Sequence, residues 1–566
     1  MSNCMRSTIY KKVIRSLQNV NNACQHKIMS NLHIKFNEIG GTYSFVLPLK
    51  SKDYDITNKI ENITNNAVLD TFDNVTVNDS SVYFNVSRDR YIKGILENNF
   101  FGVMPPLLVD NDKNIVVEFS SPNIAKPFHF GHLRSTVIGN CIANISNFLQ
   151  NQVTRINYLG DWGTQFGYIY LGMKTLNTDS MKMQTDPLKT LYKVYVDANK
   201  LAEDDPNMKE QAKEIFSQLE LGNDNTIYEN WQSIRQFTTI ELEKTYKRIG
   251  IVFDKYDWES MYTAKNISKI INLMEEMQLL TLDSSNRKVV SISEEKSIPV
   301  IKSDGSTLYM SRDIAAAIDR FEKYKFDTMY YVVDYSQSDH FFNLIHILSK
   351  MQLPWVDRLR HVKFGRVHGM STRKGTAIFL EDILNEAKEI MKQKQIITKT
   401  TKVPLSKLDE TSDILGVSSV IVHNLKQNRM NNCVFDWNSV LDMKGDTGIK
   451  LQYVHCRLCS LEEICGTTLI GECDPSLLRE IEIDHLITLI SQFDEVVLKS
   501  YKELEPCTLT VYLFHLCKSI NIAWRKLNVR NQPNDLGSQR LLLFHVAKMT
   551  LAQGMKLLGL TPLNKM

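Results

Sequence analysis

Two histidines, His129 and His132, stand three residues apart with Gly131 between them. If a helix begins here, both imidazoles share one face and lie beside free N–H groups and a positive dipole end, which suit a phosphate. Gly131 has no side chain, so a nucleotide base can lie close to the backbone. Two imidazoles can also donate hydrogen bonds as charge develops on a phosphate in a transition state. The spacing alone fits two other interpretations, a pair of structural histidines or half of a metal site.

A phenol and a carboxylate, Tyr309 and Asp313, are four residues apart and would face one cavity if the segment is helical. This pair suits a planar guanidinium, whose fork of donors needs acceptors. The alternative is that Asp313 pairs with a neighbouring arginine, Arg312 or Arg320, on the surface.

A third stretch, Gly369 to Gly375, is small, basic and flanked by glycine. Such a loop can swing over a polyphosphate and neutralise it. By itself, the pattern does not distinguish a phosphate site from an exposed turn.

The hydrophobic pattern predicts the elements that position these residues. A compact apolar run at 115–119 is typical of a buried parallel strand. Apolar residues within 137–149 then share one helical face, and 153–158 predicts the next strand. Together these segments form a βαβ unit. Further strand-like runs occur at 299–302 and 329–333.

The pattern also predicts how the rest of the chain is organised. Residues 36–110 alternate between strand-like and helical runs, as in a small α/β module. Within an α/β core of 111–395, residues from about 170 to 295 are mostly helical and charged, as an insertion would be. From 400 to 566 the apolar spacing is almost entirely helical.

Composition limits the class of protein. A chain of 566 residues is too long for one core, and no run of 18 or more apolar residues indicates a membrane span. The net charge of +3 permits a locally basic RNA surface without predicting one. Ten cysteines do not indicate a disulfide scaffold in a chain of this length. Cys456 and Cys459 have metal-like spacing, with Cys465 and Cys473 following, but no second pair completes a zinc site, so we expect helix cysteines and no protein-bound metal.

The start of the chain is basic. No acidic residue precedes Glu38, whereas the same stretch holds Arg6, Lys11, Lys12, Arg15, Lys27 and Lys35. Starts of this kind are typical of organelle transit peptides, which we predict for residues 1–35. The alternative is a basic start that touches RNA.

Several motifs resemble those of class I aminoacyl-tRNA synthetases, in the form found in arginyl-tRNA synthetases. Residues 121–132, SPNIAKPFHFGH, resemble the HIGH signature of that family. Residues 157–167, NYLGDWGTQFG, resemble its second signature, and 369–375 resemble its KMSKS loop, in which Thr372 or Arg373 replaces the second lysine. The resemblance covers about residues 80 to 566 and is strongest at 116–167 and 303–380.

The resemblance implies a role for each matching residue. The ATP phosphates would be held by His129, His132, Lys126, Arg373 and Lys374. Other ATP contacts would come from Gly131, Met370 and Ser371. Arginine would be held by Glu118, Asn123, Tyr309, Asp313 and Gln337. The tRNA would be contacted by Tyr453 and Arg457 in the helical end and by Tyr83 and Asn85 in the small module. Two alternatives stay open: Lys126 as a solvated loop lysine and Tyr453 as a core aromatic.

The same resemblance implies a fold and an activity. The fold is α/β, with a class I Rossmann-like parallel-sheet core, a helical insertion, a small N-terminal α/β module and a C-terminal all-α anticodon-binding bundle. The activity is ATP-dependent activation of L-arginine and its transfer to tRNA-Arg, with Mg²⁺ accompanying ATP, by a monomer that does not bind membranes. With the basic start, it indicates a mitochondrial form, the alternative being cytoplasmic. A short HIGH-type nucleotidyltransferase would lack the helical end, and a non-catalytic RNA-binding paralogue would have lost signature residues.

Overall fold

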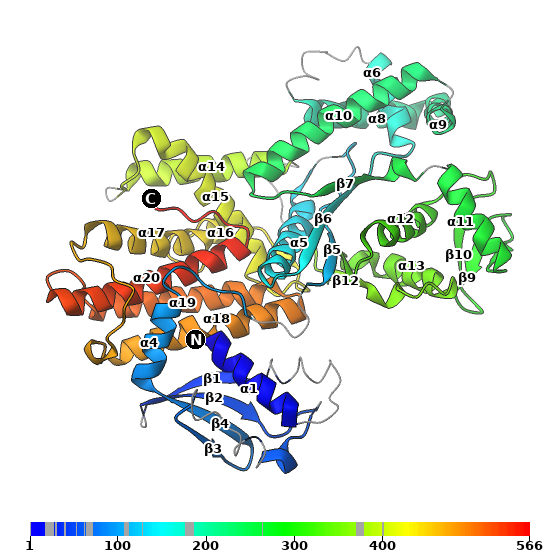
Figure 1. Ribbon diagram of the computed structural model, residues 1–566. Helices are drawn as coiled ribbons and strands as arrows, with labels where there is room; N and C mark the ends of the chain where they lie inside the picture. The colour runs from blue at the N-terminus through cyan, green and yellow to red at the C-terminus, as the bar shows by residue number, and fades with distance from the viewer. Residues whose placement is uncertain are drawn as a thin grey trace.

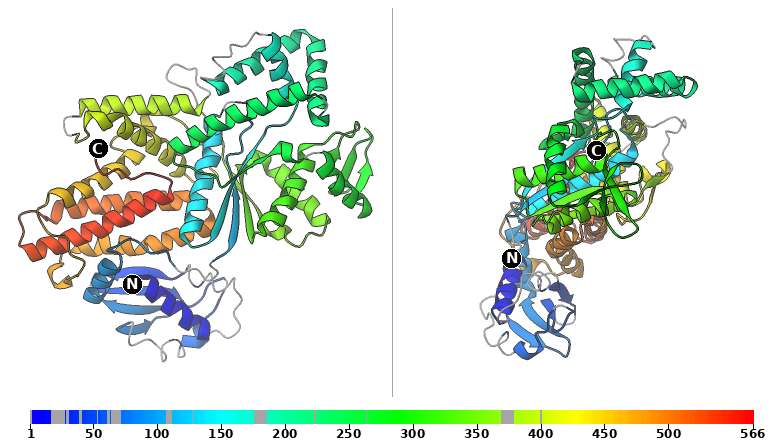
Figure 2. Two further views of the ribbon diagram at one scale, coloured as in Figure 1. Left: turned by 45° about the horizontal axis from the view of Figure 1, so that its top comes forward. Right: turned by 90° about the vertical axis from the view of Figure 1, so that its right-hand side faces the viewer.

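The computed structural model describes most of the chain and arranges it in three parts (Figure 1). The described residues are 2–16, 28, 31–38, 41–52, 54–60, 63, 72–106, 112–126, 128–175, 186–222, 224–262, 264–368, 379–398 and 401–566. A small antiparallel sheet, a central parallel sheet with helices and a bundle of helices follow one another along the chain. The two views in Figure 2 place the small N-terminal sheet and the helices inserted into the central part at opposite ends of the molecule.

Five parallel strands form the central sheet, in the order β12-β11-β5-β6-β7. They are β5 (Asn114–Glu118), β6 (Gln152–Leu159), β7 (Lys255–Trp258), β11 (Thr328–Asp334) and β12 (Leu359–Phe364). From β5 the chain proceeds outward through β6 to β7, and later in the opposite direction through β11 to β12. The strand order therefore reverses between β5 and β11, and sheets of this kind bind ligands outside the carboxyl ends of the strands at that point.

Helix α5 (Phe130–Phe148) connects β5 to β6, which confirms the predicted βαβ unit. The helix packs closely on the loop that leaves the sheet, since a Cβ added to Gly139 would lie 2.3 Å from side-chain atoms of Phe119. Glycine at this position allows the close approach. As a result, the first turn of α5, with both histidines, lies beside the carboxyl end of β5.

Among the residues that the structure describes between β6 and β7, four helices form the helical insertion. They are α6 (Gln165–Thr175), α8 (Pro187–Asp204), α9 (Pro206–Leu221) and α10 (Asn225–Arg248). Asp186, Asp205 and Asp224 cap three of them by accepting hydrogen bonds from backbone N–H groups of the first turns. The chain returns to the central sheet at β7, inside the range that the pattern indicated as insertion, because a strand of four residues is too short to stand out between helices.

Between β7 and β12 the chain forms a small antiparallel sheet and three helices. The elements are α11 (Ala264–Glu276), β8 (Leu280–Leu282), β9 (Lys288–Ser291), β10 (Ser297–Ile301), α12 (Tyr309–Tyr324) and α13 (Ser338–Lys350). The predicted strands at 299–302 and 329–333 correspond to β10 and β11. Helix α12 begins just after a turn, and its first residue, Tyr309, lines a cleft together with that turn.

The C-terminal part is a bundle of helices, as the sequence predicted. Its elements are α14 (Leu380–Ile397), α15 (Leu408–Leu425), α16 (Trp437–Val440), α17 (Gly448–Ile464), α18 (Ile481–Glu503), α19 (Pro506–Lys526) and α20 (Asn534–Leu557). A short parallel pair joins β13 (Val367–His368), which lies before the bundle in the sequence, to β14 (Cys433–Val434) within it. Short 3-10 helices occur at η1 (Thr57–Lys59), η2 (Glu259–Met261), η3 (Tyr335–Gln337), η4 (Val356–Arg358), η5 (Leu405–Lys407) and η6 (Pro475–Leu477). Within the described ranges, no helix has the length and apolar character needed to cross a membrane.

The N-terminal part contains an antiparallel sheet, with helices α1 and α4 among its described residues. Its elements are α1 (Ser2–Ser16), β1 (His33–Asn37), β2 (Thr42–Pro48), β3 (Asn74–Val77), β4 (Ser81–Ser87) and α4 (Arg88–Asn98), with strand order β1-β2-β4-β3. Met5, Ile9 and Val13 of α1 are buried, at one-turn spacing. The residues predicted as a transit peptide thus include a packed helix, and removal of residues 1–35 would take α1 and the start of β1 away.

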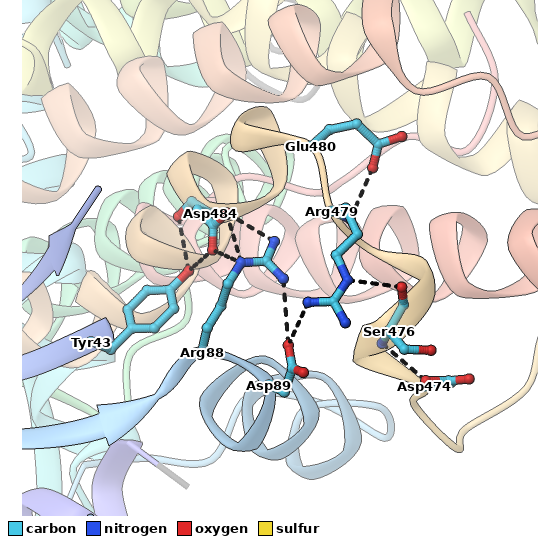
Figure 3. A network of polar contacts seen from close by, with 8 residues as sticks. All are labelled: Tyr43, Arg88, Asp89, Asp474, Ser476, Arg479, Glu480 and Asp484. Atoms are coloured by element: carbon cyan, nitrogen blue, oxygen red, sulfur yellow. Dashed lines mark hydrogen bonds and ion pairs between the residues drawn. The ribbon is translucent and has the colours of Figure 1, made fainter. Parts of the chain in front are cut away.

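Two carboxylates of α18 fasten this N-terminal part to the bundle. Asp484 accepts hydrogen bonds from the hydroxyl of Tyr43 at 2.8 Å and from Nε and Nη2 of Arg88 at 3.0 and 2.9 Å (Figure 3). Glu495 pairs with Arg6 and accepts a hydrogen bond from the backbone N–H of Ile34 at 2.8 Å. Since Arg6 is only 1% exposed, the basic N-terminal helix depends on a residue near the other end of the sequence.

Candidate active site

A cavity of about 370 Å³ opens at the point where the strand order reverses. It is lined by Ser120, Ser121, His129, Gly131, His132, Ser135, Val332, Val333, Asp334, Phe364, Arg366 and Val367. These residues follow β5, begin α5 and end β11 and β12, so the two predicted histidines and the glycine between them lie in the crevice where such sheets bind nucleotides.

The hydrogen bonds of the two histidines fix which ring nitrogen is free. His129 is the N-cap of α5, and its Nδ1 accepts from the backbone N–H of Gly131 at 3.1 Å. The backbone N–H of His129 donates to Nδ1 of His132 at 3.3 Å. The ring centroids are 4.0 Å apart and nearly parallel, at 21°. Because both Nδ1 atoms accept, each neutral ring carries its proton on Nε2, where it can be donated to a ligand.

Burial keeps both imidazoles neutral. It lowers the pKa of His132 to about 3, with smaller contributions from the neighbouring His129 and the charge of Lys126. Burial likewise lowers the pKa of His129. The site therefore offers two neutral N–H donors at pH 7, and Lys126, which is exposed, is close enough for its charge to be felt by both rings.

The turn between β5 and α5 holds two serines in a left-handed conformation. Ser120 and Ser121 have φ angles of 73° and 47°, which are uncommon for residues other than glycine. The backbone N–H of Ser120 donates to Oγ of Ser135 at 3.0 Å, and that of Ser121 donates to Oδ1 of Asn157 at 3.0 Å. Each strained residue is thus held by a side chain of the core, as is common where a backbone must approach a ligand.

The carboxylate of Asp313 lies beside this crevice. Tyr309 is the first residue of α12, its side chain is exposed, and Asp313 follows one turn later. Oδ2 of Asp313 is 2.6 Å from Nε2 of His340. The sequence left open a pairing of Asp313 with Arg312 or Arg320, but the guanidinium of Arg312 lies 5.0 Å from the centre of the Tyr309 ring, and Arg320 pairs elsewhere.

Glu118, expected to contact arginine, is buried and already has two partners. Its Oε2 accepts from Nη1 of Arg320 at 2.6 Å, and its Oε1 accepts from Oγ of Ser121 at 3.2 Å. Asp257 at the end of β7 accepts from Nε of the same arginine at 2.9 Å. Glu118 therefore lies on the floor of the site, where it joins β5 to α12.

A further carboxyl group near Asp313 is that of Glu259, which the sequence analysis did not identify. It begins η2 directly after β7, and its Oε2 is buried with no hydrogen-bond partner among the described residues. The nearest charge is Nε of Arg312, 4.0 Å away. Burial raises the pKa of Glu259 to about 8, with further contributions from Asp313 and Asp161. Glu259 could have been identified from its position at the carboxyl end of a core strand, but that strand, β7, lies inside the predicted insertion.

The structure describes only two of the remaining predicted substrate residues, Asn123 and Gln337. Oδ1 of Asn123 accepts from the backbone N–H of Ala125 at 3.0 Å, and Asn123 bridges to Gly160 of the second signature. Gln337 ends η3, next to β11, and is exposed. Met370, Ser371, Arg373 and Lys374 lie outside the described residues, directly after β13. Among the residues that the structure describes, no group of three or more His, Cys, Asp or Glu side chains could hold a metal ion.

A second cleft, of about 540 Å³, adjoins the site at Tyr309. It is lined by Gly163, Thr164, Gln165, Lys213, Phe216, Ser217, Glu220, Lys302, Asp304, Ser306, Thr307, Leu308, Tyr309 and Arg312. Its walls come from the second signature, from helix α9 of the insertion and from the turn that precedes α12. The insertion thus forms one side of this cleft.

The bundle has its own cavity, of about 510 Å³, with aromatic and basic walls. Tyr453 is 49% exposed, so it is not the core aromatic that the sequence left open. The guanidinium of Arg457 lies 4.3 Å from the ring centre of Trp524 and 5.5 Å from that of Tyr453. Cys456 lines this cavity from α17, and its thiol donates to the backbone carbonyl of Leu563 at 3.1 Å.

The small module presents Tyr83 and Asn85 on one face of β4. Both are half-buried, whereas Phe84 between them is buried on the other face. The hydroxyl of Tyr83 accepts from Asn78 at 3.2 Å, and Asn85 donates to Oδ1 of Asn74 at 2.6 Å. These polar groups form a network across the surface strand β3.

Known proteins share this architecture. The family described as "tRNA synthetases class I (R), catalytic domain" matches residues 103–437, and the "DALR anticodon binding domain" matches residues 451–566. The chain is 41% identical over 493 residues to the "Probable arginine--tRNA ligase, mitochondrial" of Mus musculus, which covers 85% of each chain. It is 39% identical over 472 residues to the "Arginine--tRNA ligase, cytoplasmic" of Saccharomyces cerevisiae, which covers 81% of this chain and 77% of that one.

The structure agrees with these matches. A crystal structure of arginyl-tRNA synthetase from Plasmodium falciparum has a TM-score of 0.77 with this chain at 26% identity, covering 100% of this chain and 99% of the other. The match to the catalytic domain over residues 103–437, together with the parallel sheet, places the chain among the class I tRNA synthetases. Within that class, the chain belongs to the family of arginine–tRNA ligases.

Proposed function

We propose that the protein activates L-arginine with ATP and transfers it to the 3′ end of tRNA-Arg for protein synthesis. The observation that carries this proposal is the proximity of two kinds of chemistry at the carboxyl ends of the central strands. Neutral imidazole donors, suited to phosphate, line the crevice at the start of α5. Two carboxyl groups suited to a guanidinium, Asp313 in α12 and Glu259 after β7, lie near each other, since the charge of Asp313 raises the pKa of Glu259. The charge of Asp313 also raises the pKa of Glu118, which accepts a hydrogen bond from Ser121 of the crevice lining. Membership of the arginine–tRNA ligases supports this assignment.

In this proposal, an oxygen of the arginine carboxylate attacks the α-phosphorus of ATP, which binds with Mg²⁺ as part of the substrate. The bond to pyrophosphate breaks, and arginyl-adenylate forms. No enzyme nucleophile takes part, so catalysis rests on positioning and charge stabilisation. Nε2–H of His129 and of His132 donates to the phosphates, and Lys126 supplies a cation beside them. Arg373 and Lys374, outside the described residues, would close over the pyrophosphate, with Met370 and Ser371 near the nucleotide.

We assign the guanidinium of arginine to Asp313 and Tyr309, together with Glu259. Asp313 is half-buried with one carboxylate oxygen engaged by His340, and Oε2 of Glu259 is buried without a hydrogen-bond partner among the described residues. Asn123 and Gln337 would hold the α-amino end. A neutral or shorter amino acid leaves these acidic groups unpaired, and sites of this kind reject analogues by about 10⁴-fold or more without editing. The insertion therefore needs no editing activity.

The tRNA would use three surfaces of the chain. Its 3′ end would enter the cleft beside Tyr309, where the terminal 2′ hydroxyl attacks the arginyl carbonyl and AMP leaves. Unstacked anticodon bases would bind in the cavity of the bundle, since Tyr453, Trp524 and the guanidinium of Arg457 offer flat surfaces for stacking. Tyr83 and Asn85 of the small module would contact another part of the tRNA. We propose, from the resemblance to arginyl-tRNA synthetases, that the chain acts as a monomer.

The anticodon surface has its own test. Trp524→Ala and Arg457→Gln should each raise the KM for tRNA-Arg in aminoacylation about 10-fold, since stacking on a base contributes about 1–3 kcal/mol. The KM for arginine and for ATP should not change, because the cavity is separate from the crevice. Tyr228→Ala, at a half-exposed aromatic of the insertion, is the matched control. Unchanged tRNA kinetics in both cavity variants would assign the anticodon to another surface.

We propose that the protein works in the mitochondrial matrix. The basic, acid-poor start and a relative named as mitochondrial support this, although a cytoplasmic relative is nearly as similar. Residues 1–35 fused to a fluorescent protein should direct it to mitochondria, and a diffuse cytoplasmic signal would favour the alternative. The N-terminus of the imported full-length protein should be sequenced in parallel, because α1 packs in the N-terminal part and Arg6 pairs with Glu495.

The proposed activity is tested by ATP–pyrophosphate exchange with each amino acid, with and without tRNA-Arg, beside an Asp313→Ala variant. Exchange that depends on arginine and collapses in the variant supports the enzyme and its pocket together. The resemblance to arginyl-tRNA synthetases also implies that exchange needs bound tRNA, which the same experiment measures. Tight tRNA binding without exchange for any amino acid would instead indicate an RNA-binding protein.

A further inference from the structure

His340 stands directly against Asp313. Its Nε2 lies 2.6 Å from Oδ2 of Asp313, and 26% of the histidine side chain and 25% of the aspartate side chain are exposed. His340 lies in the first turn of α13, three residues after Gln337, and Asp313 lies in the second turn of α12. Helix α12, which carries Tyr309 and Asp313, and helix α13, which directly follows Gln337, therefore meet at this hydrogen bond.

The backbone that carries His340 is anchored from behind. The next residue, Phe341, is 8% exposed and packs between Tyr331 of β11 and His361 of β12. The ring centroids are 4.9 Å and 4.5 Å apart for these two contacts. Because Phe341 fixes the start of α13 on the central sheet, the imidazole of His340 is held toward Asp313 and away from solvent.

The surroundings of this pair are acidic and phenolic. In addition to burial, the charge of Asp313 raises the pKa of Glu118, Tyr158, Glu259 and Tyr331. Burial alone would lower the pKa of His340, but the hydrogen bond and the charge of Asp313 together raise it above its ordinary value. The imidazole is thus a donor to Asp313 in either protonation state, with its proton on Nε2 when neutral.

We propose that His340 is a positioning residue for arginine: it holds Oδ2 of Asp313 so that Oδ1 is oriented for the guanidinium. This inference rests on the proposed function, in which Asp313 binds the substrate side chain. A planar guanidinium needs acceptors in a fixed arrangement. The terminal torsion of a free aspartate is broad, so an unheld carboxylate would sample many orientations. Removal of the imidazole therefore weakens the binding of arginine without affecting ATP or tRNA.

The test compares three variants in steady-state aminoacylation. His340→Ala removes the donor, whereas His340→Gln keeps a side-chain N–H group near Asp313. His346→Gln, on the same helix and also half-buried, is the matched control. The KM for arginine should rise about 10-fold in His340→Ala, as for the loss of a hydrogen bond to a charged group. It should stay within about three-fold of wild type in His340→Gln and in the control, and the KM for ATP and for tRNA should not change in any variant.

An Asp313→Asn variant separates the possible failures. If Asp313→Asn raises the KM for arginine and His340→Ala leaves it unchanged, Asp313 binds arginine without help and the positioning role is overturned. Parallel rises in the KM for arginine and ATP in His340→Ala would also overturn it, since they indicate a general disturbance. If Asp313→Asn does not change the KM for arginine, the proposed arginine site itself is wrong. A double variant no worse than Asp313→Asn alone supports the proposal, because His340 then acts only through Asp313.

Discussion

Glu118 and Arg320 form a buried ion pair, with Oε2 of Glu118 2.6 Å from Nη1 of Arg320 and side chains that are 5% and 1% exposed. Asp257 binds the same guanidinium through Nε at 2.9 Å. Burial alone would lower the pKa of Arg320, but the two carboxylates raise it well above its ordinary value. An internal arginine thus ties the ends of β5 and β7 to α12, the helix that carries Tyr309 and Asp313.

Arg320→Met should therefore destabilise the protein severely. The change leaves two buried carboxylates without a counter-charge, and breaking a buried pair in this way costs about 3–5 kcal/mol. Thermal melting and urea unfolding of the catalytic part should both show the loss. Lys323→Met, on the exposed face of the same helix, removes an ion pair with Asp319 and should change the stability by less than about 0.5 kcal/mol. Equal melting curves for the two variants would show that Arg320 does not have this structural role.

Glu259 should make arginine binding depend on pH. Its pKa is raised to about 8 by burial and by Asp313 and Asp161, so at pH 7 the ligand-free carboxyl is mostly protonated. A bound guanidinium favours the ionised form, so arginine binding releases a proton and the affinity increases as the pH rises from 7 toward 8. Calorimetric titration of arginine in buffers of different ionisation enthalpy measures this proton release. The pH slope due to this group should disappear in Glu259→Gln, and an unchanged slope would assign the proton to another group, such as His340.

The paired histidines should act as neutral donors. The pKa of His132 is lowered to about 3 by burial, so its ring stays neutral between pH 6 and 8. Its titration should therefore not change the rate of pyrophosphate exchange in that range. His132→Asn should lower kcat for arginine-dependent pyrophosphate exchange about 10²–10³-fold, as for the loss of a preorganised donor to a developing charge. The KM for arginine should remain within a few-fold, since the ring does not contact the guanidinium site. A rate that falls above pH 6.5 in the wild type but not in the variant would indicate a charged imidazole instead.

The sequence predicted the centre of this site because the signals there are local. Hydrophobic periods define β5, α5 and β6, and the histidines are three residues apart on one helix start. The sequence predicts the start of this helix, but it does not predict that the Nδ1 atoms of both histidines accept hydrogen bonds there. Tyr309 and Asp313 are likewise one turn apart, as their spacing indicated.

The partners of these residues could not be predicted, because each comes from a distant part of the chain. His340 is 27 positions from Asp313, and Arg320 is 202 positions from Glu118. Glu259 follows a four-residue strand that no period of the sequence marks. Arg6 was interpreted as part of a transit peptide from its basic neighbours alone, yet it pairs with Glu495, 489 positions away. The composition of a segment gives its charge, but it does not identify the distant carboxylate with which that charge pairs.

The attachment of the N-terminal module to the bundle gives a last prediction. Asp484 is buried, with its side chain 3% exposed, and Arg88 beside it is 14% exposed. Asp484→Asn leaves the mostly buried guanidinium of Arg88 with only the exposed Asp89, 3.6 Å from its Nη1, as a counter-charge, so the module should loosen and the melting temperature should fall. The KM for tRNA-Arg should rise with it if the module contacts the tRNA, whereas the KM for arginine should not change.

The matched control lies in the same network (Figure 3). Arg479 and Asp89 form an ion pair at 3.4 Å with side chains 60% and 50% exposed, and such pairs contribute about 0–1 kcal/mol. Arg479→Gln should therefore leave both melting and tRNA charging close to wild type. Hydrogen exchange of β1 to β4 measures whether the module has loosened, and tRNA charging measures whether that loosening affects tRNA binding. Faster exchange in Asp484→Asn, together with weaker tRNA charging, means that a rigidly docked module is needed for tRNA binding. Faster exchange with unchanged charging means that the module is structural and that Tyr83 and Asn85 do not contact the tRNA.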